Sequence, residues 1–155
     1  MPPGALTAAD EAMLDLTAET FRVVARDIEA VKLRDGLRDV MALAGALNRY
    51  LDEAAPWKTL KTDPERAATS LWTALQVVSS LRVLSAPFLP FSAEQLHGYL
   101  GDEGSVHALP WAPQELPAGR ALPAPSPLFR KLDDEELAGL VNRLDDAAVV
   151  TGEPG

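Results

Sequence analysis

"ALNRYLDEAAPWKTLKTDPERA", residues 46–67, connects two helical patterns through a Pro-Trp pair. Pro56 disfavours a helical conformation at the residue before it, so the helix that contains Leu51 ends before Pro56. Asp63 followed by Pro64 is typical of a helix start, because the acid caps free N–H groups and the proline fits the first turn. The segment therefore predicts two helices joined by a short connection that carries Trp57.

Two roles are open for Trp57. The indole either packs into the connection between the two helices, or it is held by Pro56 as a flat surface for a ligand. The spacing alone favours the packing role. Stacking of a nucleic-acid base on an aromatic side chain is worth about 1–3 kcal/mol and needs no net positive charge, so the second role stays open as well.

Apolar residues recur every three or four positions along most of the first hundred residues, which predicts an all-α fold, an antiparallel helix bundle. Thr7 and Asp10 form the N-terminal cap of the first predicted helix, and Ser92 with Gln95 forms a capping box for a short one that Gly101 ends. The predicted helices span about 7–31, from 33 to a point before Pro56, 64–85 and 92–101. In the third, the predicted core face is Ala68, Leu71, Leu75, Val78 and Leu81, with Trp72 beside it in the core.

The sequence changes character after Gly101, because six prolines fall within residues 102–136 and periodicity is lost. This predicts an extended tail over 102–150 that packs back on the bundle, with Trp111 as its anchor. A short terminal helix is expected over 134–144, and residues 151–155 are expected to be disordered. The predicted organisation is thus a bundle over 1–101, the tail, and a disordered end. No strand is predicted.

Composition limits the classes of function. The chain has 155 residues, no cysteine, no recognisable secretory signal and no apolar run of the ~18 residues that span a bilayer, so a soluble cytoplasmic protein is expected. The net charge is −9, but residues 20–90 carry ten basic and eight acidic side chains. This balance argues against DNA binding and against tight unaided RNA binding, and leaves a modest RNA contact possible.

Few residues suggest catalysis. His97 and His107 are the only histidines, neither has a second ligand at metal-binding spacing, and a helix-surface position is expected for His97. The acidic run at 133–136 reads as a solvated helix start. A phosphate-binding loop and a nucleophile motif are both missing. We therefore predict no catalytic residue, no metal site and no cofactor in this chain.

One face of the second predicted helix has two readings. Arg38, Ala42, Gly45 and Arg49 fall within a narrow arc at 100° per residue, with Arg34 beside them. Arginines flanking a floor of small residues suit phosphate or base edges. Alternatively, the small residues admit a neighbouring helix while Arg34 and Arg38 pair with acids. The neighbouring Asp35 and Asp39 are expected to point elsewhere.

The sequence motifs within residues 46–72 resemble those of the anticodon-binding helical domain of the class I aminoacyl-tRNA synthetases. The Asn-Arg-Tyr, Ala-Pro-Trp-Lys and Asp-Pro-Glu-Arg elements occur in that family's order. "LSAPFLPFSAEQLHGYLG" at 84–101 and "PSPLFRKLDDEE" at 125–136 resemble later segments of the methionine enzymes. Single motifs are shared with the valine, leucine and isoleucine enzymes. The whole series of motifs, which covers about residues 6–140, favours the methionine enzymes.

The resemblance implies a bundle that reads the CAU anticodon, with Trp57 in the anticodon pocket. Arg49 and Arg38 are added as candidate tRNA contacts from their helix face. The family's catalytic HIGH and KMSKS motifs and its Asn-x-x-x-Arg helix are absent from this sequence. We therefore expect a C-terminal fragment of a methionine–tRNA ligase that has no catalysis of its own.

The expected partners follow from the same resemblance. They are methionine tRNA and the missing catalytic domain, which would use ATP and Mg²⁺; neither a membrane nor DNA is expected. The alternative is a free-standing helical module that binds tRNA in trans or a protein. Without the upstream helix, an apolar groove is expected to lie open over Ala42, Gly45 and Ala46.

Overall fold

The computed structural model describes residues 2–117, 119–124 and 126–129. Its elements are all helical: α1 (Ala8–Glu29), α2 (Leu33–Ala54), α3 (Pro56–Thr59), α4 (Pro64–Ser85), α5 (Pro90–Tyr99) and the 3₁₀ turn η1 (Val106–Ala108). Contacts divide the chain into the units Met1–Pro125 and Ser126–Gly155. The all-α prediction is confirmed for the described part. The helix predicted over 134–144 and the end at 151–155 lie outside the described residues, and the boundary predicted at 101 stays a prediction.

The first helix is fixed at both ends by local bonds. Asp10 accepts from the Thr7 backbone N–H at 2.7 Å and Thr7 Oγ1 accepts from the Asp10 N–H, which confirms the predicted cap. The helix ends two residues earlier than predicted. Val31 takes a left-handed conformation with φ of 57°, and the N–H groups of Val31 and Lys32 bond to carbonyls of the last turn.

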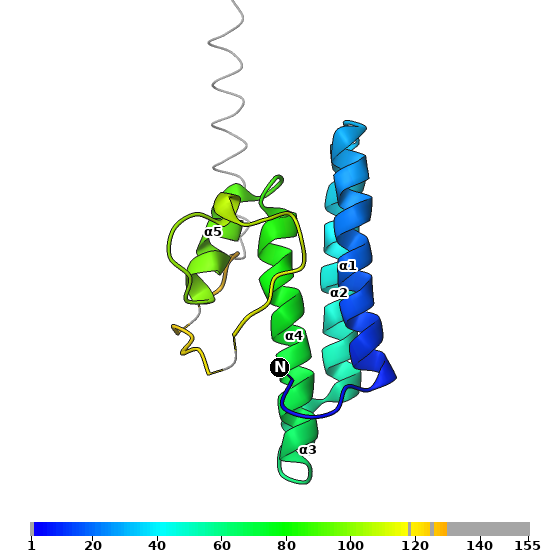
Figure 1. Cartoon of the computed structure of the whole chain (residues 1–155), viewed down its shortest axis with the longest axis vertical. Coiled ribbons are helices and arrows are strands. Elements are labelled where there is room, and N and C mark those ends of the chain that lie inside the picture. The colour runs from blue at the N-terminus through cyan, green and yellow to red at the C-terminus, as the bar shows by residue number, and fades with distance from the viewer. Residues whose placement is uncertain (1, 118, 125, 130–155) are drawn as a thin grey trace, which may run out of the picture. The chain divides into compact units, whose positions relative to one another are not determined.

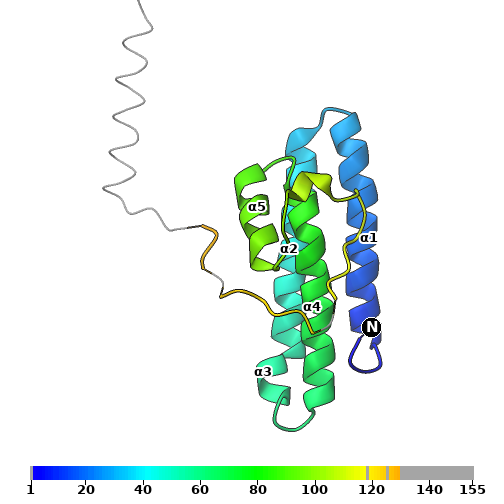
Figure 2. The same ribbon diagram turned by 60° about the vertical axis from the view of Figure 1, so that its left-hand side comes forward.

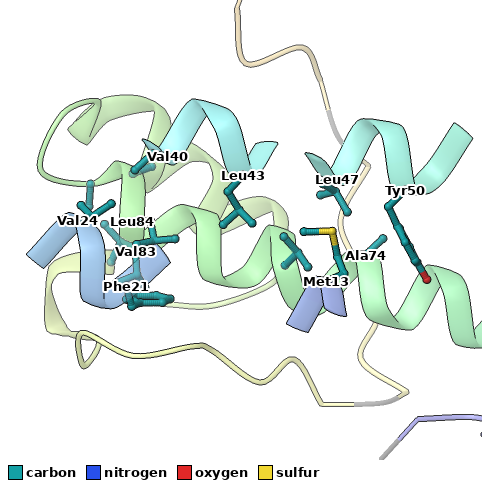
Figure 3. Packing of buried hydrophobic residues seen from close by; sticks show 14 residues of the cluster. Met13, Phe21, Val24, Val40, Leu43, Leu47, Tyr50, Ala74, Val83 and Leu84 are labelled. Carbon is teal, nitrogen blue, oxygen red and sulfur yellow. The ribbon is translucent and has the colours of Figure 1, made fainter. Parts of the chain in front are cut away.

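Three long helices share one core. Figures 1 and 2 show α1 and α2 as an antiparallel pair with α4 packed against both. Figure 3 shows side chains of the three helices pointing toward one another, with Phe21 and Val24 from α1, Leu43 and Leu47 from α2, and Leu84 from α4. Each of these five side chains is at least 95% buried, so this cluster contributes most of the hydrophobic stabilisation.

The buried face of α4 is not the predicted one. Leu71 is 46% exposed and the rest of the predicted apolar stripe is only partly buried, whereas the hydroxyl residues Thr69, Thr73 and Ser80 are fully buried. The reason is that α4 is surrounded, since it packs against α1, α2, α3, α5 and η1. Small side chains let these neighbours approach, and several hydroxyls bond to carbonyls of the preceding turn, as Thr69 does to Glu65 at 2.8 Å.

Two further predictions need correction. Helix α5 begins at Pro90 with Leu89 as its N-cap, so Ser92 lies inside the first turn and does not cap. Gly101, with φ of 74°, follows the end of α5 as predicted. Trp72 is only partly buried and lies outside the core cluster, in a depression that also contains Leu14 and Gln114.

The tail packs onto the bundle through specific hydrogen bonds. The Trp111 indole N–H donates to the Phe21 carbonyl at 3.1 Å and meets the Phe21 ring edge-to-face, which confirms Trp111 as an anchor. Gln76 accepts from the Leu116 N–H at 2.8 Å and donates to its carbonyl. These bonds explain how an irregular segment is held on the helices.

Candidate functional site

Trp57 projects from a sharp corner between two helices. Helix α2 ends at Ala54, and Ala55 turns the chain with left-handed angles of φ 39° and ψ 57°. Pro56 is buried at the first position of the short α3, and Trp57 directly after it is 58% exposed. The packing role that the spacing favoured is therefore wrong for most of this side chain, because more than half of it faces solvent.

The corner is held by a dense set of backbone bonds. The Ala55 carbonyl accepts from the N–H of Lys58 at 2.8 Å and from that of Thr59 at 3.2 Å. Asp63 then caps α4 by accepting from the Arg66 N–H at 2.9 Å. Because Pro56 fixes its own φ and these bonds hold the turn, the backbone that carries the indole is restricted.

The surroundings of Trp57 combine apolar and basic character. Leu60, three residues on, is 56% exposed, and Lys58 and Lys61 are both exposed. Among the described residues, neither lysine is joined to a carboxylate by an ion pair. An exposed aromatic flanked by free cations is an arrangement that suits an unstacked base and its phosphates.

A buried polar cluster fixes the helices beneath this corner. Asp10, fully buried, accepts from the Tyr50 hydroxyl, from Thr7 and from Arg66, whose Nη2 and Nη1 lie 2.8 Å and 2.7 Å from its two carboxylate oxygens. Burial alone would raise the pKa of Asp10, but these hydrogen bonds outweigh it and lower the pKa to about 2. The cluster ties the start of α1 to the end of α2 and the start of α4.

Sequence reasoning missed this cluster. Tyr50 and Arg66 belong to the Asn-Arg-Tyr and Asp-Pro-Glu-Arg elements, and both converge on Asp10, which the sequence suggested only as a capping residue. Their separation along the chain hides the contact. The available signal was that a tyrosine and an arginine flank the Pro-Trp corner at similar distances in the sequence.

The arginines of α2 are exposed but are not gathered around Trp57. Arg38 pairs with Asp35 at 2.9 Å, so the expectation that Asp35 points elsewhere is wrong. Arg38 lies sixteen residues before the end of α2, which is roughly 24 Å along the axis. Arg49 is the nearer of the two, about 8 Å before that end on the same scale.

An open groove runs along α1 and α2, and we call it the α1–α2 groove. Its apolar lining comes from Leu16, Val23, Ala42, Leu43 and Ala46, and its polar lining includes Glu19, Asp39 and Arg49. Its volume is about 310 Å³, and a second hollow of about 270 Å³ continues it past Arg49 to Ala9, Ala12 and Glu53. The predicted open groove is confirmed over Ala42 and Ala46, while Gly45 does not line it.

The two histidines lie in different surroundings, since His97 is buried and His107 is exposed. His97 is buried, contrary to the surface position expected for it, with Nδ1 3.1 Å from Arg82 and Nε2 3.3 Å from the Glu103 carbonyl. Arg82 also bonds to Asp102, which bonds to Arg120. Burial would raise the pKa of Asp102, but the two arginines lower it. This second cluster holds the tail against α4 and α5.

The described residues contain no group of three or more His, Cys, Asp or Glu side chains placed to hold a metal ion. Within the same residues, every helix is too short or too polar to cross a bilayer.

Comparisons with known proteins agree on one family. A family model described as the anticodon binding domain of methionyl tRNA ligase matches residues 1–148. The methionine–tRNA ligase of Roseiflexus sp. (strain RS-1) is 39% identical over 92% of this chain, and that of Thermomicrobium roseum is 40% identical over 85%. The chain spans 28% and 27% of these two relatives.

The fold agrees as well. A crystal structure of Mycobacterium tuberculosis methionyl-tRNA synthetase in its free state matches 84% of this chain with a TM-score of 0.75 and 26% identity, over 27% of its own length. A second structure of that enzyme, bound by methionyl-adenylate, matches 83% of the chain with a TM-score of 0.72. Because the family model matches residues 1–148 of its 155, this chain belongs to the family of anticodon-binding domains of methionyl-tRNA ligases.

Proposed function

We propose that this chain recognises the anticodon of methionine tRNA as one part of a methionine–tRNA ligase. The observation that carries the proposal is the 58% exposed Trp57, directly after the buried Pro56 at the α2–α3 corner. Its indole stacks on an anticodon base. Lys58 and Lys61 lie beside it and neutralise nearby phosphates, a contact that carries no sequence information of its own.

Arg49 and Arg38 are proposed as secondary tRNA contacts along α2. Arg49 is close enough to the corner to reach the nucleotides next to the stacked base. Arg38 lies farther along the helix and already pairs with Asp35, so its share of the affinity is smaller. Activation of methionine with ATP and Mg²⁺ is assigned to the parts of the ligase that this chain does not match, and the chain acts in the cytoplasm.

Weak and salt-sensitive binding follows from the charge. The net charge of −9 opposes phosphate binding, and residues 20–90 exceed neutrality by only two positive charges. The test is a titration of the chain with an RNA stem-loop that carries the CAU anticodon, and with one in which the three anticodon bases are changed. We expect measurable binding at low salt and at least about tenfold preference for CAU, the value of one good base contact. Equal affinity for the two stem-loops would contradict the proposal.

A further inference from the structure

Leu60 is a large apolar side chain beside Trp57 to which the proposed function gives no role. Its backbone N–H donates to the Pro56 carbonyl at 3.0 Å, so the helical turn that contains Trp57 continues through Leu60. Residues three apart on a helical turn have Cβ atoms about 5–6 Å apart. Trp57 and Leu60 are 58% and 56% exposed, so together they form one apolar surface on the outside of the corner.

This apolar surface is separate from the α1–α2 groove. Helix α3 packs against α4, and Figure 2 shows it beside the start of α4 and apart from α1. Neither Trp57 nor Leu60 lines either hollow of the groove. A single exposed leucine is ordinary in a folded protein, but one that adjoins an exposed tryptophan forms a patch of the kind that marks a binding surface.

Each of the two apolar residues is followed by a lysine. Lys58 comes directly after Trp57, and Lys61 directly after Leu60, so an apolar residue with a cation occurs twice at a spacing of three. Both lysines are exposed. Single-stranded RNA repeats the complementary pair, because each nucleotide brings one base face and one phosphate. The repeat at the corner therefore has the chemistry of a surface for two consecutive nucleotides.

We propose that Leu60 packs against the anticodon base next to the one that stacks on Trp57, with Lys61 near the phosphate of that nucleotide. The inference rests on the proposed function and extends it from one nucleotide to two. Side chains three apart on one helical turn lie beside each other and do not face each other, so Trp57 and Leu60 cannot enclose one base between them. Each side chain instead takes a base of its own.

The experiment is a set of double-mutant cycles between the chain and the RNA. The chain is titrated with the CAU stem-loop and with three stem-loops in which one anticodon base at a time is removed and its sugar is kept. Leu60→Ala should weaken binding of the CAU stem-loop about three- to tenfold, the value of partly burying the three carbon atoms that it deletes. This effect should disappear when one particular base is removed, and the effect of Trp57→Ala should disappear with a neighbouring base. Leu60→Met keeps the apolar volume and should bind within about twofold of the wild type.

Leu33 offers a matched control for Leu60. It is 53% exposed at the start of α2, roughly 30 Å along the axis from the end of α2 that leads to the corner, so Leu33→Ala should leave RNA affinity unchanged. Circular dichroism verifies that each variant is folded.

The results separate this inference from the proposed function. A wild type that binds the CAU stem-loop and one with changed anticodon bases equally well contradicts the proposed function itself. A wild type that prefers CAU, together with a Leu60→Ala variant of unchanged affinity, would overturn only the role of Leu60 and leave that side chain to a protein surface. A Leu60→Ala effect that persists whichever base is removed, or that couples to the same base as Trp57→Ala, would equally overturn it.

Discussion

Replacing Trp57 by alanine separates the exposed surface from the core in a single variant. Trp57 is 58% exposed, so it buries about 100 Å² of the roughly 250 Å² that a tryptophan can bury. At about 25 cal/mol per Å² this burial is worth at most ~2.5 kcal/mol, and alanine retains part of it. We therefore expect Trp57→Ala to lower the free energy of unfolding by about 1–2 kcal/mol.

The same variant should also weaken RNA binding. Loss of one base–aromatic stack weakens binding by about 1–3 kcal/mol, which is roughly 5- to 150-fold in affinity. The assays are urea denaturation of the chain and titration with the CAU stem-loop at low salt. The two readouts on one variant measure stability and recognition independently.

Two aromatic residues serve as controls for this variant. Phe91 on α5 is 89% exposed, and Phe91→Ala should change neither stability nor RNA affinity. Phe21 is 3% exposed in the core, and Phe21→Ala should cost about 3–5 kcal/mol of stability. The stacking role would be refuted if Trp57→Ala destabilised the fold as much as Phe21→Ala, or if the folded variant bound the stem-loop as well as the wild type.

Three further predictions concern the supports of the fold. The pKa of Asp10 is about 2 in the folded chain against a usual value of 3.8, which corresponds to about 2 kcal/mol of folding stability. This stability is complete above pH 5 and is lost as the pH falls from about 4 to 2. Urea titrations at several pH values should show that Asp10→Asn flattens this pH dependence. Val31 is 79% exposed in a left-handed conformation, so Val31→Gly should increase the free energy of unfolding by about 0.5–1 kcal/mol and raise the melting temperature. An unchanged or lower melting temperature would contradict backbone strain at this residue. Asp102→Asn should lower the free energy of unfolding by about 1–3 kcal/mol, because it removes the carboxylate charge paired with the buried Arg82. The same variant should be cleaved faster by trypsin after Arg120. Equal cleavage rates would show that this cluster does not hold the tail.

Features set by neighbouring residues could be predicted from the sequence. The cap formed by Thr7 and Asp10, the start of α4 at Pro64 and the left-handed Gly101 each depend on contacts within a few residues, and all three were correct. The start of α5 was wrong because two competing signals, Pro90 and Ser92, lie two residues apart. Local rules cannot rank such signals when tertiary packing decides between them.

Features set by the number of neighbours could not be predicted. An apolar stripe identifies the buried face only when a helix has one partner surface, and α4 has several. This explains why Thr69 and Thr73 are buried while Leu71 is half exposed, and why His97 lies inside a polar cluster. For Trp57 the error was the opposite one, because the spacing favoured a packed side chain and the residue is exposed. A large apolar residue at a helix end is usually packed, and only the resemblance to a family pointed to its exposure.

Under the proposed function, the motifs of residues 46–67 supply one binding side chain and two positioning side chains. Trp57 is 58% exposed, while Tyr50 and Arg66 bond to the buried Asp10. In the proposed recognition their effect would be indirect, because they hold the helices α2 and α4 from which the corner is built. A loss of RNA affinity in a Tyr50→Phe variant would therefore not identify Tyr50 as a contact. The temperature dependence of RNA affinity distinguishes the two roles. A variant of a positioning residue, such as Tyr50→Phe, should lose affinity more steeply on warming, because the corner loosens. Trp57→Ala should lose a similar binding free energy at each temperature below unfolding.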